Sequence, residues 1–253
     1  MKMRIRRADP AGSITIFVMD QAERKDYAAI SRQLLVREDL GAEQVGFVEQ
    51  KEDGSTHMQM MGGEFCGNAT RSFGYLMSML SEEKPQEIEV DVSGSAEPLK
   101  TEVDLDKGTS RTQMPLPQDI VTLPPVQGEE YKMVVLEDAP KIQEFVNEVI
   151  AEAEKILDCD AYGVMFLEGE KMTPVVYVRE TGSMVWESSC GSGSMGAAVY
   201  LSREKDNGTY VYELHQPGGM IEATVEKKDG KTLQCKMGGP VEISEEMTVE
   251  ITW

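Results

Sequence analysis

The chain has 253 residues, of which 40% are hydrophobic, so it can bury the core of one large domain or of two ordinary ones. It carries 45 acidic and 25 basic side chains, for a net charge of −20. Nucleic acids and anionic membranes repel such a charge, and we therefore expect neither as a partner.

The sequence also predicts the compartment and the use of the cysteines. No segment approaches the roughly 18 apolar residues of a membrane span, and the basic N-terminus lacks the apolar stretch of a secretory signal. We expect a cytoplasmic protein, whose thiols stay reduced. Its 4 cysteines are then no disulfide framework, and neither they nor the 2 histidines show a zinc-type spacing. We expect no metal and no organic cofactor.

Hydrophobic periodicity and turn residues predict the elements of the first half in chain order. They are a strand at 13–18, a helix at about 20–37, a strand at 45–48, an Asp-Gly hairpin turn at 51–55 and a return strand at 57–61. Gly62 and Gly63 then break the chain. A helix follows Cys66 and ends near Ser81, with strands after it at about 87–92, 97–104 and 110–114. The proline-rich stretch 114–127 is the predicted linker.

The second half shows a similar succession of predicted strands and helices. The predicted elements are a strand at about 131–136, a helix at 139–157, strands at 162–168 and 173–179, a turn at Gly182, a helix from Cys190 to about Leu201, and strands near 209–214, 219–225, 231–237 and 246–252. Residues 215–219 form a sharp turn between two of these strands. Most strands follow one another without a helix between them, which predicts an α/β (α+β) fold with mixed or antiparallel sheets.

Two similar segments stand out, and each begins with a cysteine at a predicted helix start. They are Cys66-Gly67-Asn68-Ala69-Thr70 and Cys190-Gly191-Ser192-Gly193-Ser194. A helix start has unpaired N–H groups and a partial positive charge, so it can bind a carboxylate. It should also lower a thiol pKa from about 8.5 toward neutrality. The glycines allow close approach of a ligand, and the hydroxyl and amide side chains can satisfy free helix N–H groups.

Two facing thiols can act as base and acid on opposite faces of one carbon. A thiolate removes the α-proton of an amino acid, and a thiol on the other face returns one with inverted stereochemistry. Helix N–H groups around the substrate carboxylate would stabilise the charge that develops. This pair therefore predicts racemisation without pyridoxal phosphate. The remaining cysteines, Cys159 and Cys235, are read as packing residues.

At these segments the chain resembles the diaminopimelate epimerase superfamily, whose members carry a Cys-Gly-Asn and a Cys-Gly-Thr/Ser-Gly segment. The resemblance covers nearly the whole chain. It implies two pseudo-symmetric halves, each a curled mixed or antiparallel sheet around a central helix, with the active site in the cleft between them. Residues 1–117 with about 243–253 would form the half carrying Cys66, and residues 118–242 the half carrying Cys190.

Other segments separate the subfamilies. The stretch Gly12-Ser13-Ile14-Thr15 departs from the Gly-Asn-Asp-Phe segment of true diaminopimelate epimerases, and Asn68 replaces the histidine of proline racemases. The chain most resembles the cofactor-independent histidine racemases of staphylopine-type metallophore pathways. The matching segments are Pro10-Ala11-Gly12, Glu43-Gln44-Val45-Gly46-Phe47, Glu64 to Thr70, Trp186 to Gly193, and His215-Gln216-Pro217-Gly218-Gly219.

This resemblance implies roles for single residues. Cys66 and Cys190 would be the acid and base, and Glu43 and Glu187 needed acidic residues. The further substrate-binding candidates are Ser13, Gly67, Asn68, Gly191 and Ser192, whereas His215 is read as structural. The expected partner is an amino-acid substrate, and a homodimer is the expected assembly.

Three readings stay open at this point. The preferred one is a racemase that interconverts L- and D-histidine. The second is a diaminopimelate epimerase or a racemase of broader specificity. The third, of another class, is a non-catalytic module that binds small anions or amino acids at the two helix starts.

Overall fold

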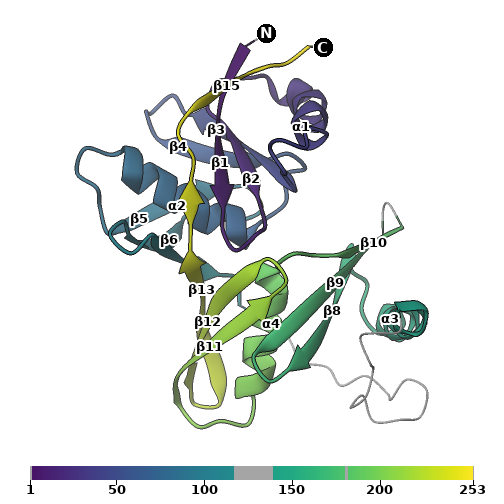
Figure 1. The fold of residues 1–253 in the computed structure, drawn as a ribbon. Helices are drawn as coiled ribbons and strands as arrows, with labels where there is room; N and C mark the ends of the chain where they lie inside the picture. The colour runs from purple at the N-terminus through teal and green to yellow at the C-terminus, as the bar shows by residue number, and fades with distance from the viewer. Residues whose placement is uncertain (1, 117–138, 180–181, 253) are drawn as a thin grey trace.

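A computed structural model of the chain describes residues 2–116, 139–179 and 182–252 (Figure 1). The expected strand at about 131–136 and the predicted linker from residue 117 onward lie outside the described residues. Within the described ranges, no helix is both long and apolar enough to cross a membrane.

The described strands form one hydrogen-bonded sheet. They are β1 (Lys2–Asp9), β2 (Thr15–Val18), β3 (Gln44–Gln50), β4 (Thr56–Met60), β5 (Glu87–Val92), β6 (Leu99–Asp104), β7 (Thr109–Met114), β8 (Ala161–Glu168), β9 (Lys171–Val178), β10 (Ser183–Trp186), β11 (Gly208–Gln216), β12 (Gly219–Lys228), β13 (Lys231–Pro240), β14 (Glu242–Ile243) and β15 (Met247–Glu250). The helices are η1 (Arg24–Asp26), α1 (Tyr27–Leu35), α2 (Gly67–Leu80), α3 (Ala139–Glu154) and α4 (Gly191–Ser202).

The sheet is mixed, as the sequence predicts. Its order is β10-β9-β11-β12-β13-β7-β6-β5-β4-β3-β2-β1-β14, with β8 beside β9 and β15 beside β1. The pairs β2–β3, β4–β5 and β9–β11 are parallel, and the other pairs are antiparallel. We call the elements β1–β7, α1, α2, β14 and β15 the α2 half, and α3, α4 and β8–β13 the α4 half. The halves join where β7 pairs with β13.

Helix α2 is the centre of the first half because nearly all of its faces are covered. Ala69, Phe73 and Leu76 pack with residues of β2, β4 and β5 in one hydrophobic cluster. The helix also contacts β6 and β7. Gly74 makes this close packing feasible, since a Cβ there would lie 2.5 Å from a Thr101 methyl carbon in β6.

Helix α4 is the central helix of the second half. Its apolar residues Met195, Ala197, Ala198 and Val199 pack against β11, β12 and β13, with Cys235 in the same cluster. The second helix in this half, α3, packs on β8 and β9 through a separate cluster around Val146. Cys235 is fully buried here, which confirms its reading as a packing residue. The same reading is wrong for Cys159, whose side chain is exposed.

The C-terminal strands return to the first half. After β13, both β14 and β15 pair with β1, and Lys2 lies opposite Glu250. The two ends of the described chain therefore lie side by side at one end of the molecule (Figure 1). This return gives the α2 half a strand from each end of the sequence.

Three elements differ from the sequence predictions. Strand β1 was not predicted, although Met3 and Ile5 alternate with exposed or half-buried residues, because the basic side chains obscure the pattern. The helix predicted at about 20–37 begins only at the short η1, since its first residues have no buried face. Residues Ser183–Trp186 form strand β10, for which the sequence analysis predicts no element, and they pair with β9.

Candidate active site

Cys66 is the N-cap of α2. Its backbone is extended, with φ −131° and ψ 113°, and its sulfur accepts a hydrogen bond from the Ala69 N–H at 3.4 Å. The Thr70 hydroxyl donates to the Cys66 carbonyl at 2.7 Å. The thiol thus lies among the free N–H groups of the helix start, as the sequence predicts.

Cys190 is the N-cap of α4 in almost the same geometry. Its φ is −123° and its ψ 110°, and its sulfur accepts from the Gly193 N–H at 3.4 Å. The Ser194 hydroxyl donates to the Cys190 carbonyl at 2.6 Å. One expectation is corrected: Thr70 and Ser194 donate to carbonyls, and the cysteine sulfurs take the capping role that we assigned to hydroxyls.

The two helix starts lie next to each other. A Cβ atom at Gly191 would be 3.9 Å from the Asn68 backbone nitrogen, and the Met237 side chain packs against both Gly67 and Gly191. The Asn68 amide donates to the Ser189 hydroxyl at 3.4 Å, which links the two segments directly. Free N–H groups from two helices therefore converge on one region, which suits a carboxylate.

Glu187 contacts Cys190 and sets it apart from Cys66. Burial raises the pKa of the Cys190 thiol, and the charge of Glu187 and its hydrogen bond raise it further. Burial also raises the pKa of Glu187, and the nearby charge of Glu43 adds to this. The structure thus brings Glu187 to the second cysteine and Glu43 close to Glu187.

Cys66 has different neighbours. Burial raises the pKa of its thiol, whereas the Ala69 N–H and the Gln44 side chain lower it by hydrogen bonding. The charges nearby include Glu64, which raises the pKa of Cys66. The expectation of thiol pKa values lowered toward neutrality is therefore wrong for both cysteines in the protein without substrate, because burial outweighs the helix N–H groups.

Sequence reasoning missed Gln44 as a site residue. Its side-chain amide donates to the Thr15 hydroxyl at 2.9 Å and to the Ser13 hydroxyl at 3.4 Å, and it also contacts the Cys66 sulfur. Ser13, a predicted substrate-binding residue, thus contacts Gln44, which in turn contacts the thiol. The only sequence signal was the position of Gln44 beside Glu43 in the matching segment.

Gln216 is a second residue that the sequence did not single out. Its side-chain oxygen accepts from the Cys190 backbone N–H at 2.8 Å, and its nitrogen donates to the Ser194 hydroxyl at 3.0 Å. It therefore fixes the start of α4 from the neighbouring strand β11. His215, the residue before it, is exposed on the same strand.

A cavity of about 680 Å³ opens beside Cys190. Its polar lining residues include Glu187, Cys190 and Ser192, and the Ser192 side chain is exposed. Its walls are mainly apolar and aromatic, with Tyr162, Met165, Leu167, Val176 and Tyr200 among them. In the described part of the chain, no group of three or more histidine, cysteine or acidic side chains is placed to hold a metal ion.

Comparisons with known proteins agree with this geometry. A family model described as the histidine racemase CntK N-terminal domain matches residues 2–249. A histidine racemase from Fusobacterium nucleatum is 31% identical over 97% of this chain and 96% of its own length. One from Staphylococcus aureus is 29% identical over 92% of each chain.

Solved structures with the same fold share much less sequence. A hydroxyproline epimerase from Agrobacterium vitis, with trans-4-hydroxy-L-proline bound, is 10% identical, with a TM-score of 0.64 over 98% of this chain and 92% of that one. The structure of a predicted epimerase from Pseudomonas aeruginosa is 14% identical, with a TM-score of 0.65 over 98% of this chain and 99% of that one. These likenesses confirm the predicted racemase and epimerase fold.

Proposed function

The chain belongs to the histidine racemase family, and we propose that it interconverts L- and D-histidine with Cys66 and Cys190, one of which removes the α-proton while the other donates a different proton to the opposite face of the same carbon. It is an isomerase, an amino-acid racemase that does not depend on pyridoxal phosphate, and its substrate is a small molecule. Histidine as the substrate and the two-thiol mechanism are the parts that we propose. The observation that carries them is the meeting of two cysteine-capped helix starts beside Glu187.

The neighbours of the two sulfurs suggest which one starts as the base. Cys66 receives hydrogen bonds from donors, the Ala69 N–H and the Gln44 amide, and these favour a thiolate. Cys190 faces the Glu187 carboxylate, which accepts a hydrogen bond from the S–H group and so favours the thiol. In our proposal Cys66 takes the α-proton, and Cys190 gives its proton to the opposite face of the same carbon. This leaves a Cys66 thiol and a Cys190 thiolate, and exchange with water restores the starting state.

The substrate carboxylate would sit between the helix starts. The backbone N–H groups around Gly67, Asn68, Gly191 and Ser192 are the donors in this proposal. They would hold the carboxylate in the ground state and stabilise the additional negative charge when the α-proton leaves. The extended N-cap backbone of both cysteines keeps the sulfurs on the same side as these N–H groups.

Acidic side chains support a cationic substrate. Glu64 lies near the Cys66 sulfur and Glu187 near the Cys190 sulfur, and Glu43 lies near Glu187. Such a charge favours the ammonium group and a protonated imidazole over an acidic substrate side chain, because like charges repel. The departures of the sequence from diaminopimelate epimerases agree with this.

Chiral chromatography tests the substrate. The enzyme alone is incubated separately with L-histidine, L,L-diaminopimelate, L-proline and L-lysine. We expect D-histidine to form fastest, with a kcat/KM well above that for each of the other substrates. Turnover of another amino acid with no turnover of histidine would contradict the proposed substrate while leaving the racemase class intact.

Replacing Glu187 by glutamine should separate its effects on Cys190 and on substrate. Without the carboxylate the pKa of Cys190 falls, so iodoacetamide should alkylate Cys190 faster at neutral pH. The kcat/KM for histidine should fall about 10²-fold, because the thiol form of Cys190 and a cation-binding group are lost together. Peptide mapping by mass spectrometry measures the alkylation. Glu168→Gln, an exposed acid at the end of β8, is the control. Wild-type values for both measurements in the Glu187 variant would contradict its role.

The domain boundaries and the compartment also remain proposals. We divide the chain into residues 1–117 with about 243–253, and residues 118–242, so that each half supplies one thiol. The pairing of β14 and β15 with β1 supports this division. We place the enzyme in the cytoplasm because the mechanism needs reduced thiols. The homodimer stays a prediction from the sequence.

A further inference from the structure

Arg71 is the largest side chain that the structure buries completely. It lies in α2, just over one turn after Cys66, and its exposed fraction is 0%. Burying a cation is costly unless an anion compensates it. A guanidinium group buried in α2, where an apolar side chain would be expected, therefore needs a partner of opposite charge.

The hydrogen-bond partners of Arg71 are all neutral. Its Nε donates to the Asn68 side-chain oxygen at 3.3 Å, and one Nη donates to the carbonyls of Gly239 at 3.0 Å and Pro240 at 2.9 Å. The other Nη is buried without a partner. Among the residues that the structure describes, no carboxylate forms an ion pair with Arg71.

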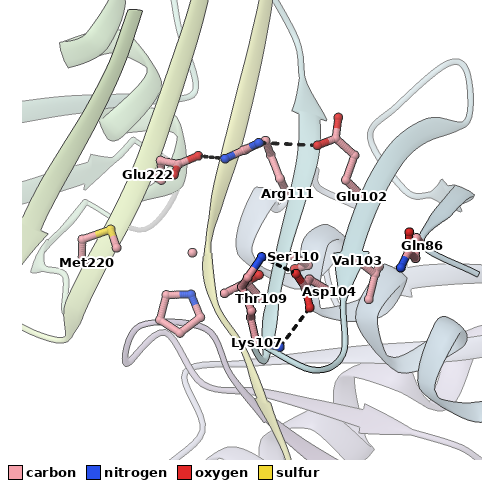
Figure 2. Close-up of a pocket in the computed structure, with 12 residues that line it drawn as sticks. Gln86, Glu102, Val103, Asp104, Lys107, Thr109, Ser110, Arg111, Met220 and Glu222 are labelled. Atoms are coloured by element: carbon pink, nitrogen blue, oxygen red, sulfur yellow. Dashed lines mark hydrogen bonds and ion pairs between the residues drawn. The ribbon is translucent and has the colours of Figure 1, made fainter. Parts of the chain in front are cut away.

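Arg111 in β7 has the partners that an arginine side chain usually has, and it can be compared with Arg71. It contacts both Glu222 and Glu102, and it lines a pocket at the junction of the halves (Figure 2). Gly239 and Pro240 line the same pocket, so the two arginines belong to one region of the molecule. Arg111 is already neutralised by carboxylates, whereas Arg71 is not.

The charged groups that interact with Cys66 include Glu64, Cys190 and the cation Arg71, whose Nε also bonds Asn68, two residues after Cys66. Burial lowers the pKa of the Arg71 guanidinium to about 9, and the charge of Cys66 acts against this. The guanidinium is therefore still protonated at neutral pH. A Cys66 thiolate is the anion at hand that would balance it.

We propose that Arg71 is the buried positive charge that holds Cys66 as the thiolate of the pair. This rests on the proposed two-thiol function and supplies a positive charge that opposes the effect of burial on the Cys66 thiol. Arg71 is a positioning residue in this proposal: it acts on Cys66 through space and, through Asn68, on the Ser189 hydroxyl beside Cys190. Substrate would not touch it.

The test compares Arg71→Met with Arg71→Lys. Alkylation by iodoacetamide is followed at each cysteine by peptide mapping from pH 6 to 10. In Arg71→Met we expect Cys66 to react about tenfold more slowly near neutral pH, because an opposite charge shifts a neighbouring pKa by about one unit or more. The kcat for histidine should fall similarly with little change in KM. Lysine keeps the charge and should restore most of both rates. Arg111→Met is the matched control and should leave the reactivity of Cys66 unchanged.

Two results would overturn the proposal. One is a folded Arg71→Met enzyme, judged by its circular dichroism and Tm, in which Cys66 reacts at the wild-type rate. The other is a folded Arg71→Lys enzyme in which Cys66 reacts as slowly as in the methionine variant. If Arg71→Met does not fold, the wild type and Arg71→Lys decide: Cys66 must react at lower pH than Cys190 in the wild type, and the reverse order overturns the proposal.

These outcomes are separate from a failure of the proposed function. If the two-thiol mechanism is wrong, Cys66→Ser or Cys190→Ser keeps racemase activity, whatever the alkylation profile shows. If only the role of Arg71 is wrong, both cysteine variants are inactive while Cys66 keeps its reactivity in Arg71→Met.

Discussion

Replacing Cys66 by serine is expected to reduce histidine racemisation about 10²–10⁴-fold, and replacing Cys190 by serine should do the same. A serine hydroxyl is nearly isosteric with the thiol, but it ionises far less readily, so it cannot serve as base or acid near neutral pH. Each sulfur also accepts one helix N–H, from Ala69 or Gly193, which a hydroxyl oxygen can accept equally well. The fold and the helix starts should therefore survive both changes.

The control for this pair is Cys159→Ser. Cys159 is exposed, and no role in the site is assigned to it. Circular dichroism and the Tm should be close to wild type in all three variants, and chiral chromatography of histidine gives the rates. Near-wild-type racemisation by either Cys66→Ser or Cys190→Ser would rule out a two-thiol mechanism, because the remaining thiol would then suffice.

Replacing Gly12 by alanine is expected to have the second large effect. A Cβ atom at Gly12 would lie 2.6 Å from the Cα atom of Gly218 and 2.7 Å from its carbonyl oxygen. Both clashes are with backbone, so no side-chain rotation relieves them. The Gly218 N–H donates to the Ser188 carbonyl at 2.8 Å, in the segment that carries Glu187 and Cys190. Moving Gly218 would therefore move Glu187 and Cys190 relative to Cys66.

Gly54 supplies a close control for this prediction. Its φ of +85° matches the +82° of Gly12, but nothing lies within 4 Å of a Cβ atom there. Both alanine variants should lose about 1–3 kcal/mol from the strained backbone conformation. Only Gly12→Ala should also lose kcat/KM, by about 10²-fold, because displacements near 1 Å disturb catalysis strongly. Thermal unfolding and steady-state kinetics measure the two effects. Equal kcat/KM in both variants would show that contact with Gly218 does not position the site.

The close approach at Gly12 explains two of the matching sequence segments. Pro10-Ala11-Gly12 and the turn before β12 lie far apart in the sequence, and each reads only as a turn. In the structure, Gly12 contacts Gly218 and Ala11 contacts Gly219, so the two turns interlock across the halves. Sequence periodicity carries no information about such a contact, because it depends on how the halves dock.

The sequence predicts the centre of the site well because its signals are local. A cysteine before small residues and an apolar run predicts a capped helix start, and both α2 and α4 begin directly after their cysteines. Local patterns of apolar and turn residues also predict the helix ends and the mixed sheet. Residues such as Gln44 and Gln216 could not be found this way, because long-range contacts bring them to the thiols.

Electrostatics are the other part that the sequence could not supply. The helix start alone suggested lowered thiol pKa values, but burial raises the pKa of Cys66 and of Cys190 in the folded protein. Burial depends on the packing of both halves, to which residues such as Met237 contribute from β13. The difference between the two thiols likewise depends on Glu187 and Arg71, whose partners are known only from the structure.

Isotope exchange during a single conversion of L-histidine to D-histidine tests most directly whether two thiols act on opposite faces of Cα. L-histidine is converted in D2O, and the deuterium at Cα is measured by NMR or mass spectrometry in both enantiomers at early times. If one thiolate removes the α-hydrogen and the other thiol, which carries deuterium in D2O, donates to the opposite face, the D-histidine formed carries deuterium. The remaining L-histidine still carries hydrogen. D-histidine that retains the original hydrogen, or L-histidine that exchanges as fast as D-histidine forms, would contradict a mechanism in which Cys66 removes the α-proton and Cys190 donates a different proton to the opposite face of the carbon.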